Sequence, residues 1–261
     1  MRSLNLKAKL LFLLAFSVSA SAFPNKAEDI TFDFLVETGQ KTGYCDHIAH
    51  IQKILENYPV EILLELGVGY STKHFLDTCK KVISIEFITE SIRNDWLMLC
   101  LNLYHDYSNW LPIAYFSNYT GDYSWAPYKY LGSSKLSEGV LAYDTRHTLP
   151  DSSYLTELQT LINNVLKNNK ANLILVDPPL LFRGPIIQSL FNKVPIIVSH
   201  DCAAFGQPQI FDTYGFRQIQ APANYETVFI SQGKGTLIWI KKEEKTKLLI
   251  EKMKEYANLS T

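Results

Sequence analysis

The fold is decided by residues 62–72, which read Ile62-Leu63-Leu64-Glu65-Leu66-Gly67-Val68-Gly69-Tyr70-Ser71-Thr72. An apolar run leads straight into a turn that contains two glycines. About twenty residues after its start, a second apolar run over 82–85 ends in Glu86. The order predicts a strand, a glycine turn, a helix, a second strand and then an acid. That unit binds the adenosine end of a cofactor in nucleotide-binding α/β folds.

Each residue type in this unit suits a cofactor site. Gly67 and Gly69 let the backbone turn sharply and let a ligand approach closely. Ser71 or Thr72 is expected to cap the following helix, whose first turn presents free N–H groups to a carboxylate. Glu86, at the carboxyl end of the second strand, is expected to accept hydrogen bonds from both ribose hydroxyls.

The glycine spacing separates two kinds of cofactor. Thr72 stands where a dinucleotide-binding fingerprint has its third glycine, which argues against a pyrophosphate at the turn. The pattern Glu65-x-Gly67-x-Gly69-x-Ser71-Thr72 instead resembles motif I of the class I S-adenosylmethionine-dependent methyltransferases. By order of elements the resemblance extends over about residues 60–240. It implies S-adenosylmethionine as the cofactor, held by Gly67, Gly69, Ser71 and Glu86, with Glu65 orienting its amino-acid end.

The rest of the chain alternates strands and helices. Apolar runs predict strands at 60–66, 82–86, 111–116, 172–176 and 195–199, followed by a hairpin at 227–231 and 236–240. Helical patterns fall at 44–57, 72–79, 89–103, 154–167, 185–192, near 207–214 and at 241–257. The first of these places Ile48, Ile51, Ile54 and Leu55 on one side. This order predicts an α/β fold, a Rossmann-like, doubly wound and mostly parallel sheet with a C-terminal antiparallel β-hairpin, in three α/β/α layers. Residues 23–261 are expected to form one methyltransferase-like domain.

Chemical groups follow the fourth and fifth predicted strands, where ligands bind in open α/β sheets. Asp177-Pro178-Pro179 resembles motif IV of class I methyltransferases, which lies next to the reactive methyl group. Asp177 and Asp201 also have the spacing of metal-dependent O-methyltransferases, which implies a divalent cation on these two carboxylates, although Cys202 stands where that family has Asn. His200 is a candidate base or softer ligand. Asp177, His200 and Asp201 are therefore the predicted catalytic residues; the alternative is that such strand-end groups merely cap neighbouring helices.

A third resemblance points to the acceptor. Asp177-Pro178-Pro179, Arg183-Gly184-Pro185-Ile186 and Val198-Ser199-His200-Asp201 are similar to a pattern of the glucuronoxylan 4-O-methyltransferase group. It implies that Arg183 holds a substrate carboxylate by a bidentate pair; the alternative is a surface ion pair that contributes little. The segment 117–152 is long for a connection and rich in Tyr, so we expect a functional loop or lid. In it, Trp125 and Tyr128 are candidates to stack on a sugar or aryl acceptor; the alternative is a loop packed by its own tyrosines.

The N-terminal residues predict export. Arg2, Lys7 and Lys9 precede an apolar run, and Ala20-Ser21-Ala22 is a small-x-small cleavage site, so residues 1–22 have the features of a signal peptide. An uncleaved anchor and a buried N-terminal helix are the alternatives. After cleavage we expect no stable membrane span. The protein would then be periplasmic, secreted or in the lumen of the secretory pathway. Cleavage would also leave 22 basic and 26 acidic residues, a net charge of −4, which excludes the basic excess of a nucleic-acid binder.

These observations predict methylation of a hydroxyl on a sugar or small molecule. A non-catalytic binding protein that keeps the fold is the main alternative, because Cys202 departs from the metal-dependent pattern and S-adenosylmethionine is made in the cytosol. A sugar-nucleotide enzyme is a third possibility, although phosphate-binding groups are scarce near Gly67. The four cysteines, at 45, 79, 100 and 202, show no metal-binding spacing, and buried thiols and disulfides both stay open.

Overall fold

The computed structural model describes residues 46–88, 97, 99–116, 141–144, 154–178, 183–202 and 214–260. The predicted signal segment 1–22 lies outside this part of the chain. So do Trp125, Tyr128 and most of the Tyr-rich segment, and nearly all of the helix expected near 207–214. In the described part, no helix is long and apolar enough to cross a membrane.

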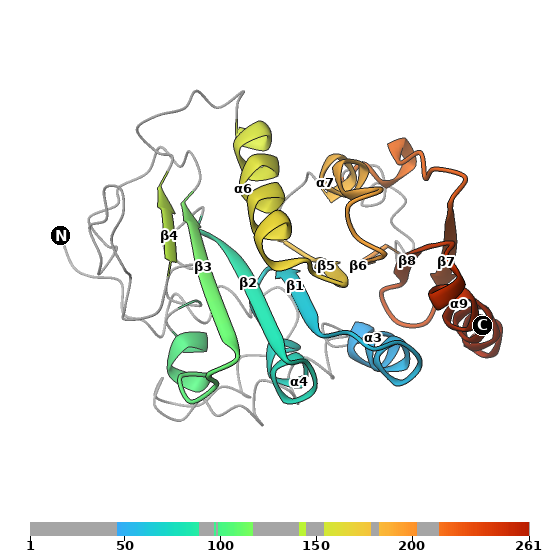
Figure 1. Cartoon of the computed structure of the whole chain (residues 1–261), viewed down its shortest axis with the longest axis horizontal. Helices are drawn as coiled ribbons and strands as arrows, with labels where there is room; N and C mark the ends of the chain where they lie inside the picture. The colour runs from blue at the N-terminus through green and yellow to red at the C-terminus, as the bar shows by residue number, and fades with distance from the viewer. Residues whose placement is uncertain are drawn as a thin grey trace, which may run out of the picture.

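One mixed sheet forms the centre of the molecule (Figure 1). Its strands lie in the order β4-β3-β2-β1-β5-β6-β8-β7. The first six strands in this order are parallel to one another, and β8 is antiparallel to both β6 and β7. Their bounds are β1 (Ile62–Leu66), β2 (Lys81–Ile88), β3 (Trp110–Phe116), β4 (Leu141–Asp144), β5 (Leu173–Val176), β6 (Ile196–His200), β7 (Tyr225–Ile230) and β8 (Thr236–Lys241).

The sheet confirms the predicted architecture, including the C-terminal hairpin of β7 and β8. Strand β1 lies between β2 and β5, so the chain moves outward in one direction from β1 to β3 and in the other from β5 onward. The carboxyl end of β1 is therefore the topological switch point at which ligands bind in such sheets. The β1 and β5 strands are apolar and buried on both sides, apart from Glu65 and the half-buried Ile62, as expected for central parallel strands.

Helices cover both faces of the sheet, which gives the three predicted layers (Figure 1). One face carries α3 (Asp46–Asn57), α4 (Thr72–Thr78) and α9 (Lys247–Leu259), whose Ile54, Phe75 and Met253 belong to one buried cluster. The other face carries α6 (Tyr154–Asn169) and α7 (Arg183–Leu190), whose Ile162 and Ile187 belong to a second cluster. Short 3-10 turns at Phe216–Gln218 and Glu244–Thr246 complete the described elements.

The structure corrects the prediction at three places. Residues 141–144 form the edge strand β4, inside a stretch expected to be a loop, because their pairing partner β3 is 25 or more residues away and periodicity cannot show it. Helix α7 begins at Arg183 and not at 185. On α3 the buried side chains are His47, His50, Ile51 and Ile54. Ile48 and Leu55, which the pattern places on one side with Ile51 and Ile54, are only partly buried.

The cysteines that the structure describes are buried free thiols: Cys79, Cys100 and Cys202. Of the two interpretations that the sequence left open, the structure therefore supports the thiol interpretation at these three positions. Cys45 lies outside the described residues.

Candidate functional site

The glycine turn joins the ends of three neighbouring strands. The Gly67 N–H donates to the Ile85 carbonyl at 2.8 Å, and the Asp177 N–H donates to the Leu66 carbonyl at 3.2 Å. Gly67 has φ of +97°, a backbone conformation that side-chain-bearing residues rarely adopt. The turn also lies so close to the end of β5 that a Cβ at Gly67 would be 2.8 Å from the Asp177 carbonyl oxygen.

Glu86 lies beside this turn, one residue beyond the paired Ile85 of β2. Its Oε2 accepts a hydrogen bond from the Val68 N–H at 2.6 Å. Gly67 and Glu86 therefore share one place at the switch point, as the sequence predicted, and the Glu86 side chain is fully buried there. Its role towards a ribose stays a prediction.

Glu65 forms the floor of the turn. Its Oε1 accepts hydrogen bonds from the Thr72 hydroxyl at 2.9 Å and the Ser84 hydroxyl at 2.5 Å. The Thr72 hydroxyl oxygen in turn accepts the Gly69 N–H at 2.9 Å. Complete burial raises the pKa of Glu65 to about 8, in spite of these two donors. A carboxyl group that holds its proton near neutral pH thus lies directly under the predicted cofactor turn.

Ser71 does not cap the helix as expected. It precedes α4 but makes no side-chain hydrogen bond to the helix, and its φ and ψ of −85° and −19° are already helical. A capping residue needs extended backbone to aim its oxygen at the first N–H groups. Thr72 is the other candidate, but its hydroxyl accepts the Gly69 N–H and donates to Glu65 instead. Cofactor binding by Ser71 stays a prediction.

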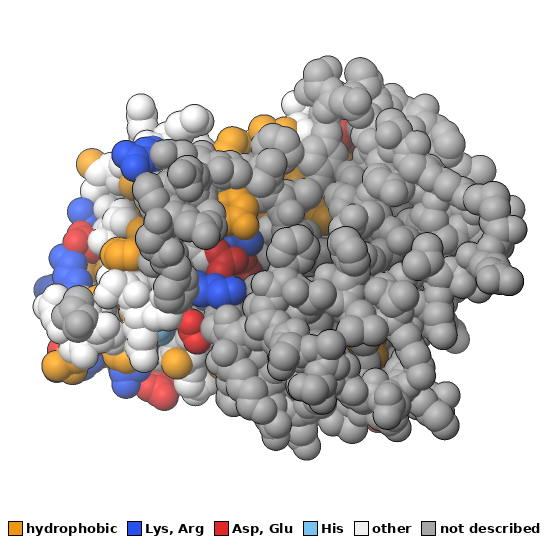
Figure 2. Space-filling view, turned by 180° about the vertical axis from the view of Figure 1, so that it is seen from behind, with side chains coloured by type: hydrophobic (Ala, Val, Ile, Leu, Met, Phe, Trp, Pro, Cys, Tyr) orange, Lys and Arg blue, Asp and Glu red, His pale blue; other side chains and the backbone are white. Residues whose placement is uncertain are grey.

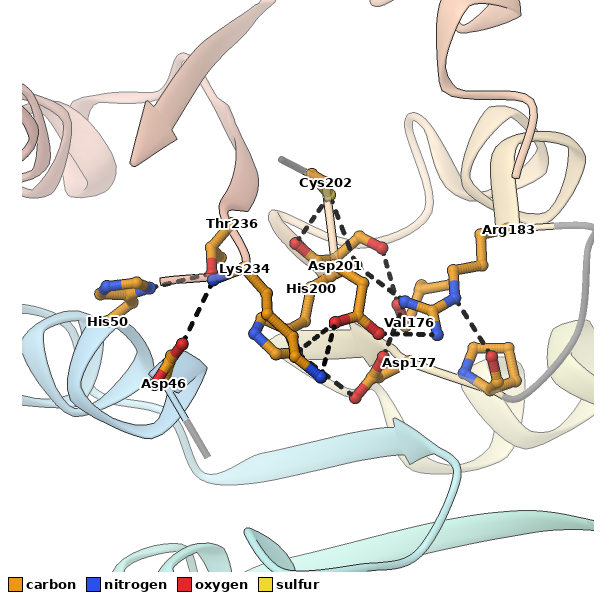
Figure 3. Close-up of polar contacts among 12 residues, drawn as sticks. Asp46, His50, Val176, Asp177, Arg183, His200, Asp201, Cys202, Lys234 and Thr236 are labelled. Carbon is orange, nitrogen blue, oxygen red and sulfur yellow. Dashed lines mark hydrogen bonds and ion pairs between the residues drawn. The ribbon is translucent and has the colours of Figure 1, made fainter. Parts of the chain in front are cut away.

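A cluster of charged and imidazole side chains lies at the ends of β5 and β6 (Figure 3). Asp177 follows β5, and His200 and Asp201 follow one another at the end of β6. His200 Nδ1 lies 3.6 Å from Asp201 Oδ1 and 3.9 Å from Asp177 Oδ2. The three predicted catalytic residues are therefore brought together. On the face in Figure 2, acidic and basic side chains lie next to one another where the described surface ends.

Arg183 is at the centre of the cluster. Its Nη1 lies 2.7 Å from Asp177 Oδ1 and its Nη2 3.5 Å from Asp201 Oδ2, while Nε and Nη1 donate to the carbonyls of Pro178 and His200. The guanidinium also stacks on the Tyr214 ring, 4.3 Å from its centroid. The side chain is 3% exposed. This corrects the surface ion pair considered from the sequence, and it directs the guanidinium at protein oxygens. Binding of a substrate carboxylate by Arg183 stays a prediction.

The metal arrangement expected from the sequence meets two obstacles. The cation that lies between Asp177 and Asp201 is the guanidinium of Arg183. Cys202 contributes no thiolate, since burial raises its pKa to about 12 and its Sγ donates to the Ser199 carbonyl. Asp201 has φ of +57°, and the Cys202 N–H that follows it is bonded to the Gly235 carbonyl of the hairpin turn. A hard cation held by Asp177 and Asp201 alone is not what this geometry favours.

His47 belongs to the cluster and was missed from the sequence. It is 2% exposed on α3, and its ring centroid lies 4.5 Å from that of His200. Ligand atoms of His47, Asp177 and His200 all lie within 4.8 Å of one another. Burial is the main cause that lowers the pKa of His47 to about 3 and that of His200 to about 4, so both rings are neutral at pH 7. Residues 47, 50, 51 and 54 lie on one face of a helix. This spacing is the signal by which the sequence could have placed His47 and His50 on the buried side.

Contacts with the C-terminal hairpin hold α3 in place (Figure 3). Asp46 Oδ2 accepts the Lys234 N–H at 3.2 Å, and His50 Nδ1 lies 2.9 Å from the Thr236 hydroxyl. A Cβ at Gly233 would clash with the Asp46 side chain, so a side chain there would displace the carboxylate that accepts the Lys234 N–H. These contacts join segments that are 186 to 188 residues apart in the sequence, and they fix the helix that carries His47.

No protein-family description and no curated protein matches this sequence. Solved structures do resemble it. One is a caffeoyl-CoA O-methyltransferase homologue from Staphylococcus aureus, 14% identical, with a TM-score of 0.48 over 90% of this chain and 98% of that chain. Another is an O-methyltransferase from Bacillus cereus in complex with S-adenosylhomocysteine, 14% identical, with a TM-score of 0.42 over 90% of each chain. A third is a TDP-rhamnose 3′-O-methyltransferase of calicheamicin biosynthesis, 10% identical, with a TM-score of 0.43 over 90% of this chain and 91% of that chain.

The order and direction of the strands identify the fold. Apart from the edge strand β4, the sheet has seven strands. When these are numbered 1 to 7 along the chain, they lie in the order 3-2-1-4-5-7-6, and only strand 7, which is β8, runs antiparallel to the others. This is the class I methyltransferase fold. The methyltransferase-like sheet presents Glu65, Gly67 and Glu86 at its switch point, with Asp177 and His200 on the strands next to it.

A separate cavity of about 520 Å³ opens between α3 and α4. Its lining includes none of the residues predicted from the sequence to bind or react: Asp46, Ile48, Ala49, His50, Gln52, His74 and Gln232. His50 borders both this cavity and the buried face of α3 that carries His47.

Proposed function

We propose that the protein is an S-adenosylmethionine-dependent methyltransferase that acts on a hydroxyl group of a small molecule or sugar. One observation carries the proposal: the Gly67 turn, with its positive φ, and the Glu86 carboxylate lie side by side at the switch point of a methyltransferase-like sheet. Glycine permits close approach of the adenosine, and a carboxylate pairs with the two ribose hydroxyls.

The Asp177 cluster supplies the place for the acceptor. It adjoins the glycine turn through the contact between Gly67 and the Asp177 carbonyl. In the reaction, the acceptor oxygen bonds to the methyl carbon as the bond from carbon to sulfur breaks, and sulfur keeps the electron pair. The hydroxyl proton must pass to a base, and neutral His200 is the candidate, because its two ring nitrogens make no hydrogen bond among the described residues. The main contribution of the protein is to align oxygen, carbon and sulfur.

A binding protein that keeps the fold without activity is the second candidate. It is favoured by Arg183, which fills the space between the two carboxylates expected to hold a cation, and by the protonated thiol of Cys202. Export through residues 1–22 remains part of both proposals, and sequencing of the N-terminus of the secreted protein tests it.

Ligand binding distinguishes the candidates. The melting temperature of the full chain is measured with S-adenosylmethionine, with S-adenosylhomocysteine and with a UDP-sugar. A ligand at 100 times its Kd stabilises the folded state by about 2.7 kcal/mol. We expect S-adenosylmethionine and S-adenosylhomocysteine to raise the melting temperature and the UDP-sugar to leave it unchanged. A rise with the UDP-sugar alone would replace the proposal with a sugar-nucleotide enzyme, and a rise with none of them would favour the binding protein.

A further inference from the structure

We propose that His47, Asp177 and His200 form a binding site for a divalent transition-metal ion of the Zn²⁺ type. The site differs from the Asp177 and Asp201 pair that the sequence suggested, because two of its three ligands are imidazoles and one comes from α3. It does not depend on methyl transfer, and it can be tested without any methyl donor. With a metal bound, His200 is a ligand, and the Asp201 carboxylate, 3.6 Å from its ring, is then the candidate base.

The three side chains converge from separate elements on one point. His47 extends from the first turn of α3, Asp177 follows β5, and His200 ends β6. Their ligand atoms lie within 4.8 Å of one another. In a tetrahedral zinc site with bonds of about 2.05 Å, ligand atoms are about 3.3 Å apart, so each atom needs to move inward by less than about 1 Å. Side-chain rotation supplies such a movement without a change of fold.

The two histidines are the strongest evidence for a ligand. They are 2% and 1% exposed, and among the described residues neither Nδ1 nor Nε2 of either ring has a hydrogen-bond partner. Buried polar atoms nearly always have such a partner, because their loss of hydration is otherwise uncompensated. Four such nitrogens, on two rings 4.5 Å apart, therefore favour a ligand between the rings.

Charged groups of both signs surround the rings. His200 Nδ1 lies 3.6 Å from Asp201 Oδ1 and 3.9 Å from Asp177 Oδ2. Arg183 pairs with both carboxylates, and Lys234 Nζ lies 4.0 Å from Asp201 Oδ1. A bound divalent ion would satisfy one nitrogen of each ring, and the Asp177 carboxylate would offset part of its charge.

The surroundings already hold the ligands in position. Arg183 binds Asp177 Oδ1 at 2.7 Å, which leaves Oδ2 on the side of His200, at 3.9 Å. The contacts from Asp46 to Lys234 and from His50 to Thr236 fix the helix that carries His47. Metal ligands are usually oriented by such outer contacts. Asp177 is 23% exposed, so an ion there would keep an open position for a water molecule or a hydroxyl.

The ligand set selects the metal. Imidazole favours Zn²⁺, Fe²⁺, Co²⁺, Ni²⁺ and Cu²⁺, whereas Mg²⁺ and Ca²⁺ prefer sites made of oxygen ligands only. The Cys202 thiol donates to the Ser199 carbonyl and is not among the three ligands. We therefore expect Zn²⁺ and Co²⁺ to bind, and Mg²⁺ to bind at least about 1000-fold more weakly.

Metal binding by the full chain gives the first test. The protein is treated with a chelator, dialysed and titrated with Zn²⁺, Co²⁺ or Mg²⁺ in a calorimeter, with no methyl donor present. X-ray absorption of the Co²⁺ form should show two imidazole ligands. Absence of binding, equal affinity for Mg²⁺, or a spectrum without imidazole would each overturn the proposal.

Variants give the second test. His47→Gln and His200→Gln should each weaken Zn²⁺ binding about 100-fold or more, since a lost outer contact alone costs 10- to 100-fold. His105→Gln, at the surface, is the control that separates the site from adventitious binding. Equal weakening in all three variants would contradict the site. Binding of S-adenosylmethionine in the presence of chelator is measured in parallel, so loss of the metal proposal leaves the methyltransferase proposal standing.

Discussion

Gly67 and Asp177 are packed so closely that the first has no room for a side chain: a Cβ on Gly67 would lie 2.8 Å from the Asp177 carbonyl oxygen. Gly67 begins the turn predicted to hold the cofactor, and Asp177 begins the cluster predicted to react. The two halves of the candidate site are therefore a single rigid unit, formed where β1 and β5 end side by side.

Gly67→Ala should lower the free energy of unfolding by at least about 2 kcal/mol. It combines a φ of +97° that alanine avoids with a backbone clash that cannot relax cheaply. Urea denaturation measures the loss. Gly215→Ala is the matched control, because Gly215 also has a positive φ but its nearest atom is a proline side-chain carbon at 3.4 Å. A smaller loss for Gly67→Ala than for the control would show that the contact with Asp177 is not restrictive.

Glu86→Gln should weaken S-adenosylmethionine binding roughly tenfold, because a neutral amide replaces a charged acceptor for the ribose. The amide oxygen can still accept the Val68 N–H, so the melting temperature should change less than in Glu86→Ala. Calorimetry measures the affinity. Glu226→Gln serves as the control, since this residue pairs with Lys242 and Lys254 on β7, away from the glycine turn. Unchanged affinity in Glu86→Gln would remove Glu86 from the cofactor site.

Glu65 makes stability depend on pH. Its pKa is about 8 in the folded protein and near 4.5 when unfolded, so between these values the folded state holds a proton that the unfolded state has lost. Stability from this group therefore falls as pH rises from about 4.5 to 8 and levels off above, by up to ~1.4 kcal/mol for each pH unit.

Glu65→Gln removes this titration while it keeps an oxygen for Thr72 and Ser84. The variant should gain stability relative to the wild type as pH rises from 5 to 8, measured by urea denaturation at each pH. A stability difference that stays constant over this window would mean that Glu65 has an ordinary pKa.

Arg183→Met should destabilise the protein by about 3–5 kcal/mol, because it leaves two carboxylates without their buried partner. Arg183→Lys should lie between this variant and the wild type. It keeps the charge but loses the forked contacts and the stacking on Tyr214. Thermal and urea unfolding measure both variants.

Lys80→Ala is the control for this prediction. Its ion pair with Glu61 is exposed, with side chains 76% and 59% accessible, so the loss should stay within about 0.5 kcal/mol. If Arg183→Met cost no more than Lys80→Ala, the guanidinium would not be the structural centre of the cluster.

Several features could be predicted from local sequence. The strands β1, β2, β5 and β6 follow from apolar runs, and the turn follows from Gly67 and Gly69. Because parallel strands end at the same edge of a sheet, the same reasoning placed Asp177, His200 and Asp201 together. The structure confirms that they are neighbours.

Other features depend on contacts that no local pattern records. His47 meets His200 because Asp46 and His50 bind the hairpin turn, far away in the sequence. Arg183 was expected to face a substrate, and its burial follows from the way α7 packs over the ends of β5 and β6. The edge strand β4 exists through pairing with β3, and its own four residues carry too little pattern to reveal it.

The sequence by itself determined the order of strands and helices, the glycine turn and the acids at the strand ends, because hydrophobic periodicity and backbone freedom are properties of neighbouring residues. Only the tertiary structure decided which side chains meet: that Arg183 neutralises Asp177, and that His47 faces His200. Such pairings are set by the packing of elements distant in the chain, where burial removes water and makes each polar contact matter.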